Sequence, residues 1–294
     1  MLFVEKTKLK GGNSLNIREL LNRGYYVLKN NKIETPKQKA RLIMQYVLNK
    51  PKEYIVIYDS KQVSKEDEEK YMNNINKLCK GTPIQYITNF QEFMNMSFYV
   101  NKNVLIPRQD TEVLVEEVIS LAKNKTDIKI LDLCTGSGII GISLSKNLKD
   151  SEVYASDISE GALKVARQNN DRNGTDVKYI HSNLFENIPE MKFDYIVSNP
   201  PYIKTDVIDT LSDEVRKEPI LALDGGYDGL KFYTKIAKQA IDYLKYGGYL
   251  CLEIGYDQKD DVIDILKSTG NYTKIYCKKD LCDNDRIIIA KVGD

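Results

Sequence analysis

From residue 110 onward the chain alternates between strand-like and helix-like patterns, and this alternation is the feature that most limits how it can fold. Strands that alternate with helices form βαβ units, in which each helix returns the chain so that successive strands pair in parallel. The pattern therefore predicts an α/β fold with a parallel sheet covered by helices. Strands are expected at 128–133, 152–157, 177–180, 193–198 and 248–254, and helices at 110–123, 139–148, 159–170, 229–245 and 258–268.

Two further strand-like runs end the chain, at 273–279 and 285–292, separated by a five-residue polar turn. So short a connection joins antiparallel neighbours, because parallel strands need a longer crossover. We therefore expect the final strand to return antiparallel.

The front of the chain has helical periodicity instead. Residues 37–50 place Ala40, Ile43, Met44, Val47 and Leu48 on one apolar stripe, and helices are also expected at 17–28 and 65–79, the latter capped by Ser64. Between 81 and 107 the pattern changes to Gly, Pro, aromatic residues and a short strand-like run. We expect a small all-helical domain at 1–80, a β-hairpin linker at 81–107 and the α/β domain at 108–294.

Composition narrows the class of protein. Apolar residues make up 42% and charged residues 29%, as in ordinary globular chains. No run approaches the roughly 18 apolar residues of a membrane span, and the opening MLFVEKTKLK lacks the apolar stretch of a secretory signal. The five cysteines form no CxxC pair, which indicates neither a disulfide framework nor a zinc cluster. We expect a cytoplasmic protein that binds no membrane.

The distribution of charge does not identify a binding partner, whereas the histidine content excludes some kinds of catalytic site. The first 100 residues carry a net charge of +7 and the rest −6. A basic front could attract nucleic acid or an acidic protein, but a solvated lysine-rich helical surface explains it equally well. His181 is the only histidine, so a multi-histidine metal site is excluded and a Ser-His-Asp triad could form only around this residue. We expect no metal.

A glycine-rich loop follows the first strand of the expected sheet. In LDLCTGSGIIGISL, Gly136, Gly138 and Gly141 fit G-x-G-x-x-G between a strand and a helix, and Asp157 ends the next strand 19 residues after Gly138. Such glycines let a ligand approach the backbone, and an acid at this place accepts hydrogen bonds from ribose hydroxyls. Tight packing alone also uses glycine, but the strand, helix and acid together indicate a nucleotide-type cofactor site.

The kind of cofactor depends on Asp132, at the end of the first strand. Dinucleotide oxidoreductases and methyltransferases share this glycine loop, yet a carboxylate at this place suits the ammonium or sulfonium of S-adenosylmethionine better than a pyrophosphate. A second interpretation stays open, in which Asp132 caps the backbone of the loop.

Asn199, Pro200, Pro201 and Tyr202 follow the fourth strand, at the sheet edge that carries the glycine loop. Two prolines stiffen this loop and remove backbone donors. The Asn199 side-chain carbonyl and the Pro200 carbonyl could hold both hydrogens of a planar NH2 group, with Tyr202 packed against it. Two such acceptors favour a pyramidal nitrogen whose lone pair can attack a methyl group in line. A bare strand terminus with a capping Asn is the alternative.

These motifs resemble the glutamine N5-methyltransferases that modify peptide chain release factors, the PrmC or HemK family. The resemblance covers nearly the whole chain from about Ile17 and includes GTPIQYITNFQEFMNMSFYV, LIPRQDTEVLVE, DISEGALKVARQNN and EPILALDGGYDGLKFY, as well as NPPYI. It implies a helical domain that docks a release factor, a β-hairpin linker and a seven-stranded, Rossmann-like class I methyltransferase domain. The substrate would be the glutamine in the Gly-Gly-Gln loop of class I release factors.

The resemblance also implies roles for individual residues. S-adenosylmethionine would be bound by Cys134, Thr135, Gly136, Ser137, Gly138, Asp157, Asn183, Leu184 and Asn199, and the glutamine amide by Asn199, Pro200, Pro201 and Tyr202. Arg108 lies near the site in such proteins. At Asn183 relatives commonly carry Asp, so the adenine amino group would meet a neutral acceptor here and cofactor affinity could be lower.

Two rival functions remain to be separated from glutamine methylation. Adenine-N6 methylation of RNA or DNA uses the same kind of acceptor, but a base-flipping enzyme needs many cations for phosphates and the catalytic part carries −6. We therefore expect no stable nucleic-acid binding. A regulator that binds the cofactor without turnover is the other rival, and the intact segment Asn199–Tyr202 argues against it.

Overall fold

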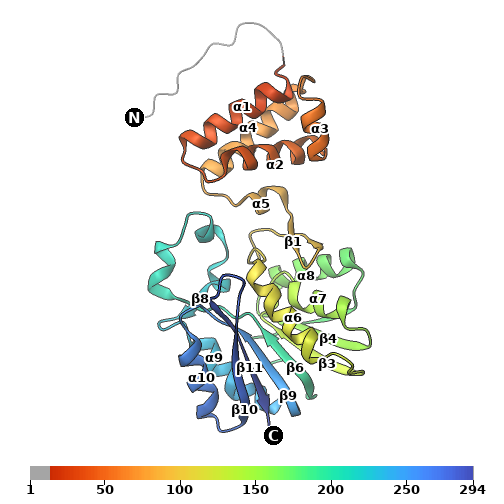
Figure 1. Ribbon diagram of the computed structural model, residues 1–294, viewed down its shortest axis with the longest axis vertical. Coiled ribbons are helices and arrows are strands. Elements are labelled where there is room, and N and C mark those ends of the chain that lie inside the picture. The colour runs from red at the N-terminus through yellow and green to blue at the C-terminus, as the bar shows by residue number, and fades with distance from the viewer. Residues whose placement is uncertain (1–13, 294) are drawn as a thin grey trace. The chain divides into compact units, whose positions relative to one another are not determined.

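The computed structural model describes residues 14–293, and the chain divides into two compact units, one ending at Thr88 and the other beginning at Asn89 (Figure 1). The division falls inside the segment 81–107 that the sequence assigns to a linker. Residues 1–13 precede the first expected helix and lie outside the described residues. No helix in the described range is long and apolar enough to cross a membrane.

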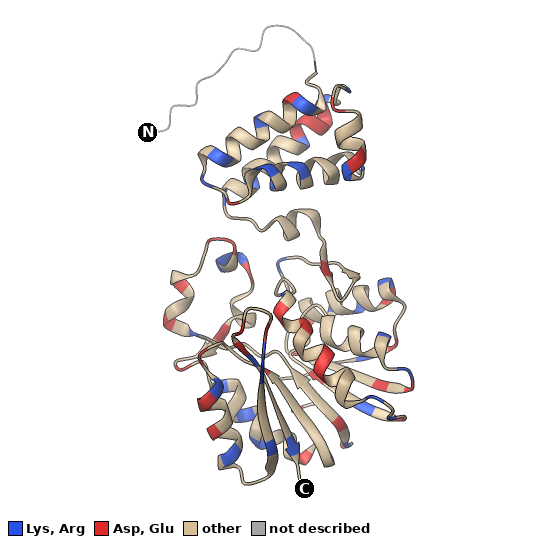
Figure 2. Ribbon diagram, in the orientation of Figure 1, with Lys and Arg blue, Asp and Glu red and all other residues tan. Residues whose placement is uncertain are grey.

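The first unit is helical and buries one apolar core built from α1, α2 and α4. Capping sets its helix ends: Ser64 accepts a hydrogen bond from the Asp67 N–H, and the left-handed Asn49 ends α2. Basic residues are spread over α1 and α2, and acids gather at the start of α4 (Figure 2). The helices are α1 (Ile17–Asn30), α2 (Pro36–Leu48), α3 (Lys52–Ile57), α4 (Lys65–Cys79) and α5 (Ile84–Thr88).

The second unit begins with a hairpin, β1 (Gln91–Phe93) and β2 (Met96–Phe98), which pair antiparallel. Met94 and Asn95 both have positive φ, as a two-residue turn between twisted strands requires. Asn169 binds the chain just after the hairpin: its side chain accepts from the Tyr99 N–H at 2.6 Å and donates to the Tyr99 carbonyl at 3.0 Å. The hairpin is thereby tied to the α/β part of its own unit.

A seven-stranded sheet forms the centre of the second unit, in the order β10-β11-β9-β6-β3-β4-β5. All neighbouring pairs among β5, β4, β3, β6 and β9 are parallel, and β11 runs antiparallel to both β9 and β10, which confirms the expected return of the final strand. The strands are β3 (Ile128–Leu133), β4 (Ser151–Asp157), β5 (Val177–His181), β6 (Phe193–Ser198), β9 (Leu244–Glu253), β10 (Tyr272–Lys279) and β11 (Asp285–Val292).

Helices cover both faces of this sheet (Figure 1). Residues of α6 and α7 pack with one set of strand side chains, including Ile128 and Ile130, and residues of α9 and α10 pack with the alternate set, including Leu131 and Leu133. This division follows from the two-residue repeat of a strand. The helices are α6 (Glu112–Leu121), α7 (Ile139–Asn147), α8 (Glu160–Asn173), α9 (Lys231–Gln239) and α10 (Lys259–Ser268), with a small pair of strands, β7 (Ile203–Lys204) and β8 (Asp224–Gly226).

Three segments differ from the sequence prediction. Helices α3 and α5 were not expected, because both are too short to show a clear apolar period. The helix expected at 229–245 ends at Gln239 and is followed by a 3₁₀ turn at Ala240–Asp242. The strand then begins at Leu244, earlier than expected, because Leu244 pairs with Phe193 of β6 and the Tyr243 carbonyl accepts the Phe193 N–H at 2.7 Å.

Gly24 allows α1 and α4 to pack closely, and its replacement tests the core of the helical unit. A Cβ at position 24 would lie 2.1 Å from the hydroxyl oxygen of Tyr71, which is fully buried. Alanine gains about 1 kcal/mol in helix propensity, but overpacking costs about 1–3 kcal/mol. We expect Gly24→Ala to lower the urea midpoint of the helical unit, measured by circular dichroism.

Tyr71→Phe removes the nearest of the colliding atoms, together with its 3.3 Å hydrogen bond to the Ala40 carbonyl, and leaves the ring carbons Cζ and Cε1 at 2.8 and 2.9 Å from the added Cβ. The loss of stability in the Gly24→Ala/Tyr71→Phe double variant should then be smaller than the sum of the losses in the two single variants. Strict additivity would show that the collision with Tyr71 does not limit position 24.

Candidate active site

The carboxyl ends of β3, β4 and β6 meet at one edge of the sheet. Leu133 pairs with both Ser156 and Ser198, so the loops that follow the three strands start at the same level. Between β3 and β6 the connections diverge to opposite sides, and such a switch point is where open α/β sheets bind ligands. A cavity of about 350 Å³ opens here, entirely within the second unit. Of the residues predicted for the site, those that line it are Cys134, Thr135, Gly136, Ser137, Asp157, Asn183, Leu184, Asn199 and Pro201.

The three glycines of the loop have different roles. Gly136 has a φ of +56° and a Cβ there would meet no atom within 4 Å, so the backbone is open to a ligand. Gly138 has a φ of +86° and caps the N-terminus of α7, and a Cβ there would collide with the Ile142 side chain. Gly138 does not line the cavity. At Gly141 a Cβ would lie 3.2 Å from Asp132. Only the first of the three is shaped for binding, and the other two allow close packing.

Asp157, at the end of β4, holds the loop and faces the cavity. One carboxylate oxygen accepts the Gly136 N–H at 2.9 Å and the other accepts the Ser159 N–H at 2.8 Å. Burial raises the pKa of this carboxyl, and the backbone N–H groups of Ser159, Gly136 and Ile158 oppose that shift. Because each carboxylate oxygen has two lone pairs, one acceptor position per oxygen is left for a pair of hydroxyl groups.

Asp132 does not line the cavity. Its side chain is fully buried, and a single oxygen accepts both the Thr135 hydroxyl at 2.5 Å and the Gly141 N–H at 2.9 Å. The second of the two sequence interpretations, capping of the loop, is therefore the one observed. The physical reason is the strand repeat: Asp132 points to the face covered by α7, under the loop, so it cannot meet a ligand above it.

Asn183 and Leu184 lie in the loop after β5 and line one end of the cavity. The Asn183 amide nitrogen donates to Glu186 at 2.7 Å, so the carbonyl end of the side chain is the one left for a ligand. Leu184 has a φ of +51°, which is uncommon for a branched side chain and marks a constrained backbone. The arrangement offers one polar acceptor beside an apolar surface.

The Asn199–Tyr202 segment presents only half of its residues to the cavity. Asn199 and Pro201 line it, and Pro200 and Tyr202 do not. The Asn199 amide nitrogen donates to the Thr111 hydroxyl at 3.4 Å. The Tyr202 ring packs against the α9 and α10 side of the core, and its hydroxyl donates to Glu253 at 3.3 Å. Tyr202 thus packs against the core and does not line the cavity, whereas the sequence predicted that it contacts a substrate.

Cys134, the first residue of the glycine loop, lines the cavity with a φ of +58°. Burial and the nearby carboxylate of Asp157 raise the pKa of its thiol. A thiol held in the neutral form is a poor nucleophile and a poor target of oxidation, so Cys134 acts here as a small apolar side chain in the cavity wall.

Arg108 joins two walls of the cavity. It forms an ion pair with Glu218, whose other carboxylate oxygen accepts the Ile106 N–H at 2.8 Å. Burial raises the pKa of the Glu218 carboxyl, and Arg108 opposes that shift. The chain before Arg108 and the chain after Glu218 both line the cavity, so this pair fixes the distance between them.

Three buried residues at the site were missed by sequence reasoning: Thr111, Asn169 and Glu253. The Asn169 side chain donates to the Ser137 carbonyl at 2.9 Å and so supports the glycine loop from α8. Glu253 ends the apolar strand β9, and an acid at the end of such a strand was a signal that the sequence offered, as it did for Asp132. Thr111 carried no signal, because a single threonine in a polar turn has no distinctive spacing.

His181, the only histidine in the sequence, does not line the cavity. A His181 ring nitrogen lies 2.8 Å from the Ile158 carbonyl, and the other lies 3.6 Å from Glu160. Within residues 14–293, no group of three or more His, Cys, Asp or Glu side chains is arranged to hold a metal ion.

The sheet order and the cavity at the switch point are those of a Rossmann-like class I methyltransferase. Two family models match the chain: the methyltransferase small domain over residues 109–217 and the PrmC N-terminal domain over residues 19–88. A solved structure of a methyltransferase from Pyrococcus furiosus superposes with a TM-score of 0.50 at 19% identity, covering 68% of this chain and 91% of that one, which supports the fold.

Curated relatives identify the family within this class. The chain is 42% identical to the release factor glutamine methyltransferase of Clostridium botulinum, over 94% of this chain and 99% of that protein. It is 40% identical to the protein of the same name from Clostridium acetobutylicum, over 95% and 99%. The chain therefore belongs to the release factor glutamine methyltransferase family.

Asp132 gives the stability of the second unit a specific dependence on pH. Burial raises the pKa of this carboxyl to about 7 from its ordinary 3.8. The unfolded chain releases the proton at lower pH than the folded chain does, so the contribution of Asp132 to stability falls as the pH rises from about 4 to about 7. Asp132→Asn removes the titration. Between pH 5 and pH 7 its free energy of unfolding should rise relative to wild type, by about 1–2 kcal/mol.

Urea unfolding across this pH range measures the difference. Asp176→Asn, at an exposed position, is the matched control. A constant difference between Asp132→Asn and wild type would show that Asp132 is ionised throughout.

Proposed function

We propose that this protein transfers a methyl group from S-adenosylmethionine to the side-chain amide nitrogen of the glutamine in the Gly-Gly-Gln motif of class I peptide chain release factors. The observation that carries the proposal is the opening of Asn199 onto the cavity that Gly136 and Asp157 also line. Full-length similarity to proteins named release factor glutamine methyltransferase supports the choice of substrate. The enzyme would meet these factors in the cytoplasm.

The cavity suits S-adenosylmethionine, which supplies an activated methyl group on a positively charged sulfur. The open backbone at Gly136 leaves room for a ligand at the glycine loop. Asp157 would accept the two ribose hydroxyls with its remaining lone pairs. Asn183 would accept the adenine amino group through its carbonyl oxygen, and Leu184 would pack on the ring.

The Asn199 loop would receive the glutamine amide. The Asn199 side-chain carbonyl accepts one amide hydrogen and the Pro200 carbonyl accepts the other, although Pro200 does not line the cavity. Both acceptors favour a pyramidal nitrogen and stabilise the transition state more than the ground state. In the direct in-line displacement the nitrogen–carbon bond forms as the carbon–sulfur bond breaks, and the amide then loses a proton to water.

Mass spectrometry of a purified release factor, incubated with this protein and S-adenosylmethionine, tests the proposal. We expect the peptide that contains Gly-Gly-Gln to gain the mass of one methyl group, located on the glutamine side chain by fragmentation. An unmodified glutamine, under conditions where the protein binds the cofactor, would contradict the proposed substrate.

Asn199→Ala should abolish methyl transfer because it removes a substrate acceptor and leaves the Gly136–Asp157 region intact. We expect at least about 100-fold lower kcat with a nearly unchanged Kd for S-adenosylmethionine, since the loss of one preorganised hydrogen bond that strengthens in the transition state costs about that much. Transfer of a labelled methyl group and calorimetry measure the two quantities. Turnover at the wild-type rate would refute the role of Asn199.

Asp157→Ala should act chiefly on the cofactor. Loss of hydrogen bonds to a charged acceptor costs about 1.5–3 kcal/mol, which corresponds to roughly 10- to 100-fold weaker binding. Calorimetry with S-adenosylmethionine measures the effect, and Asp157→Asn, which keeps the acceptor oxygen without its charge, should lose less. Wild-type affinity in Asp157→Ala would overturn the ribose assignment.

A further inference from the structure

The Asn199–Tyr202 loop has few backbone donors with which to hold its own shape. Pro200 and Pro201 carry no N–H group, so neither donates a hydrogen bond to the rest of the fold. The first end of the loop is fixed because Asn199 directly follows β6, whereas the other end depends on contacts from outside the loop. There, the Tyr202 carbonyl accepts a hydrogen bond from the side chain of Gln258 at 3.0 Å.

Gln258 lies immediately before α10 and is buried. Its Nε2 donates to the carbonyls of Tyr202 and, at 3.3 Å, of Gly229, and its Oε1 accepts the Gly255 N–H at 2.9 Å and the Tyr233 hydroxyl at 3.4 Å. A backbone carbonyl can only accept and a backbone N–H can only donate, so three backbone groups fix the orientation of this amide. One side chain thereby joins the loops that follow β6, β8 and β9.

Two glycines of the β8–α9 segment pack against the same end of the loop. A Cβ at Gly225 would lie 2.7 Å from the Tyr202 Cα, and a Cβ at Gly229 would lie 2.5 Å from the Tyr202 carbonyl oxygen and 2.6 Å from Gln258 Nε2. Only a hydrogen atom fits at either position. The glycines therefore allow the close approach that the hydrogen bonds of Gln258 require.

We propose that Gln258 is a positioning residue that holds the Tyr202 end of the loop, so that the Asn199 side chain and the Pro200 carbonyl meet the acceptor amide at fixed positions. The consequence for methyl transfer rests on the proposed function, whereas the hold on the loop is a property of the protein alone. Gln258 does not line the cavity, so it acts through the loop and is not a catalytic residue.

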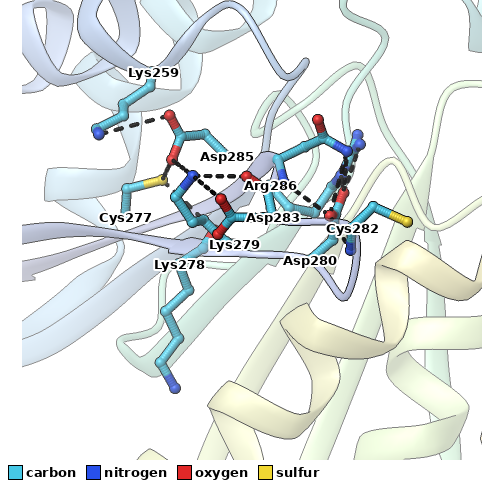
Figure 3. Close-up of polar contacts among 10 residues, drawn as sticks. Lys259, Cys277, Lys278, Lys279, Asp280, Cys282, Asp283, Asp285 and Arg286 are labelled. Atoms are coloured by element: carbon cyan, nitrogen blue, oxygen red, sulfur yellow. Dashed lines mark hydrogen bonds and ion pairs between the residues drawn. The ribbon is translucent and has the colours of Figure 1, made fainter.

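The segment that carries Gln258 is itself held against β11 on both sides. Lys259, the next residue, forms an ion pair with Asp285 at 3.6 Å (Figure 3). Before Gln258, the Ile254 N–H donates to the Arg286 carbonyl at 2.8 Å, and the Arg286 guanidinium lies 3.0 Å from Asp280 in the β10–β11 turn (Figure 3). Gln258 thus stands between two points anchored on the sheet and can hold the loop at a fixed distance from it.

Gln258→Met tests the proposal with the full-length protein, S-adenosylmethionine and a release factor. Methionine is similar in length and removes the amide. We expect kcat to fall by about 10- to 100-fold, as for a misplaced reacting group, with the KM for the release factor and the Kd for the cofactor changed by less than about threefold. Tyr272→Phe, which loses a buried hydrogen bond of 2.8 Å to the Ala237 carbonyl in the same core, is the control for stability and should keep the wild-type kcat. Wild-type kcat in Gln258→Met would overturn the proposal, as would a rise in cofactor Kd as large as the loss of kcat.

Gly229→Ala disturbs the same hydrogen bond from its other side, because the added Cβ collides with both the Tyr202 carbonyl and Gln258. Gly270→Ala is the matched control: the two glycines have φ values of +76° and +70°, but a Cβ at Gly270 would meet no atom within 4 Å. Both variants therefore carry similar backbone strain and only one carries the collision. We expect Gly229→Ala to repeat the loss of kcat and Gly270→Ala to keep the wild-type rate. Equal rates in the two variants would count against the role of Gln258.

Amide hydrogen exchange tests the hold on the loop without a substrate. The Ile203 N–H, next to Tyr202, donates to the Leu223 carbonyl at 2.9 Å and reports on this end of the loop. In Gln258→Met its exchange should be faster by about tenfold or more, while exchange in the glycine loop at 134–138 stays as in wild type. Unchanged exchange at Ile203 would overturn the inference even if a release factor is methylated. Faster exchange, together with a release factor that the wild-type protein leaves unmodified, would support the hold on the loop and refute the proposed function.

Discussion

The parallel hydrogen bonding of β3 with β4 on one side and β6 on the other is the constraint on which the site depends. Parallel strands in register end at one edge, so the loops after them open onto the same space. Asp157 and Asn199 follow different strands and are far apart in sequence, yet they line one cavity. The lengths of the intervening helices do not affect this, because the strand ends alone set where each loop begins.

Buried carboxylates hold the walls of this cavity. Asp132 fixes the glycine loop, Glu218 fixes Arg108 and the backbone at Ile106, and Glu253 accepts from the hydroxyl of Tyr202, which ends the Asn199 loop. Burying an acid raises its pKa and costs free energy that its hydrogen bonds must offset. In return Asp132 and Glu218 each accept from two donors in defined directions, which apolar packing cannot do.

The sequence predicted the seven strands of the sheet and most of the helices, because each depends on a local apolar period. It failed where the local pattern is short or where pairing overrides it. Helices α3 and α5 have too few turns to show a stripe. The segment at 240–245 continues a helical pattern, but the Tyr243 carbonyl accepts the Phe193 N–H and Leu244 pairs with Phe193, so a strand forms where the helix was expected to continue.

Which residues line the cavity was predicted from the sequence to a large extent, since the glycine loop, Asp157 and Asn199 follow strands whose ends must meet. What each side chain does there was decided only by the tertiary structure. Asp132 turns beneath the glycine loop, and Tyr202 turns toward Glu253 and away from the cavity. Thr111 and Asn199 are 88 residues apart in the sequence, and only the folding of the chain brings their side chains into contact. The periodicity of a sequence records which face of a strand is buried, but the direction of a loop side chain depends on partners that are distant in the chain.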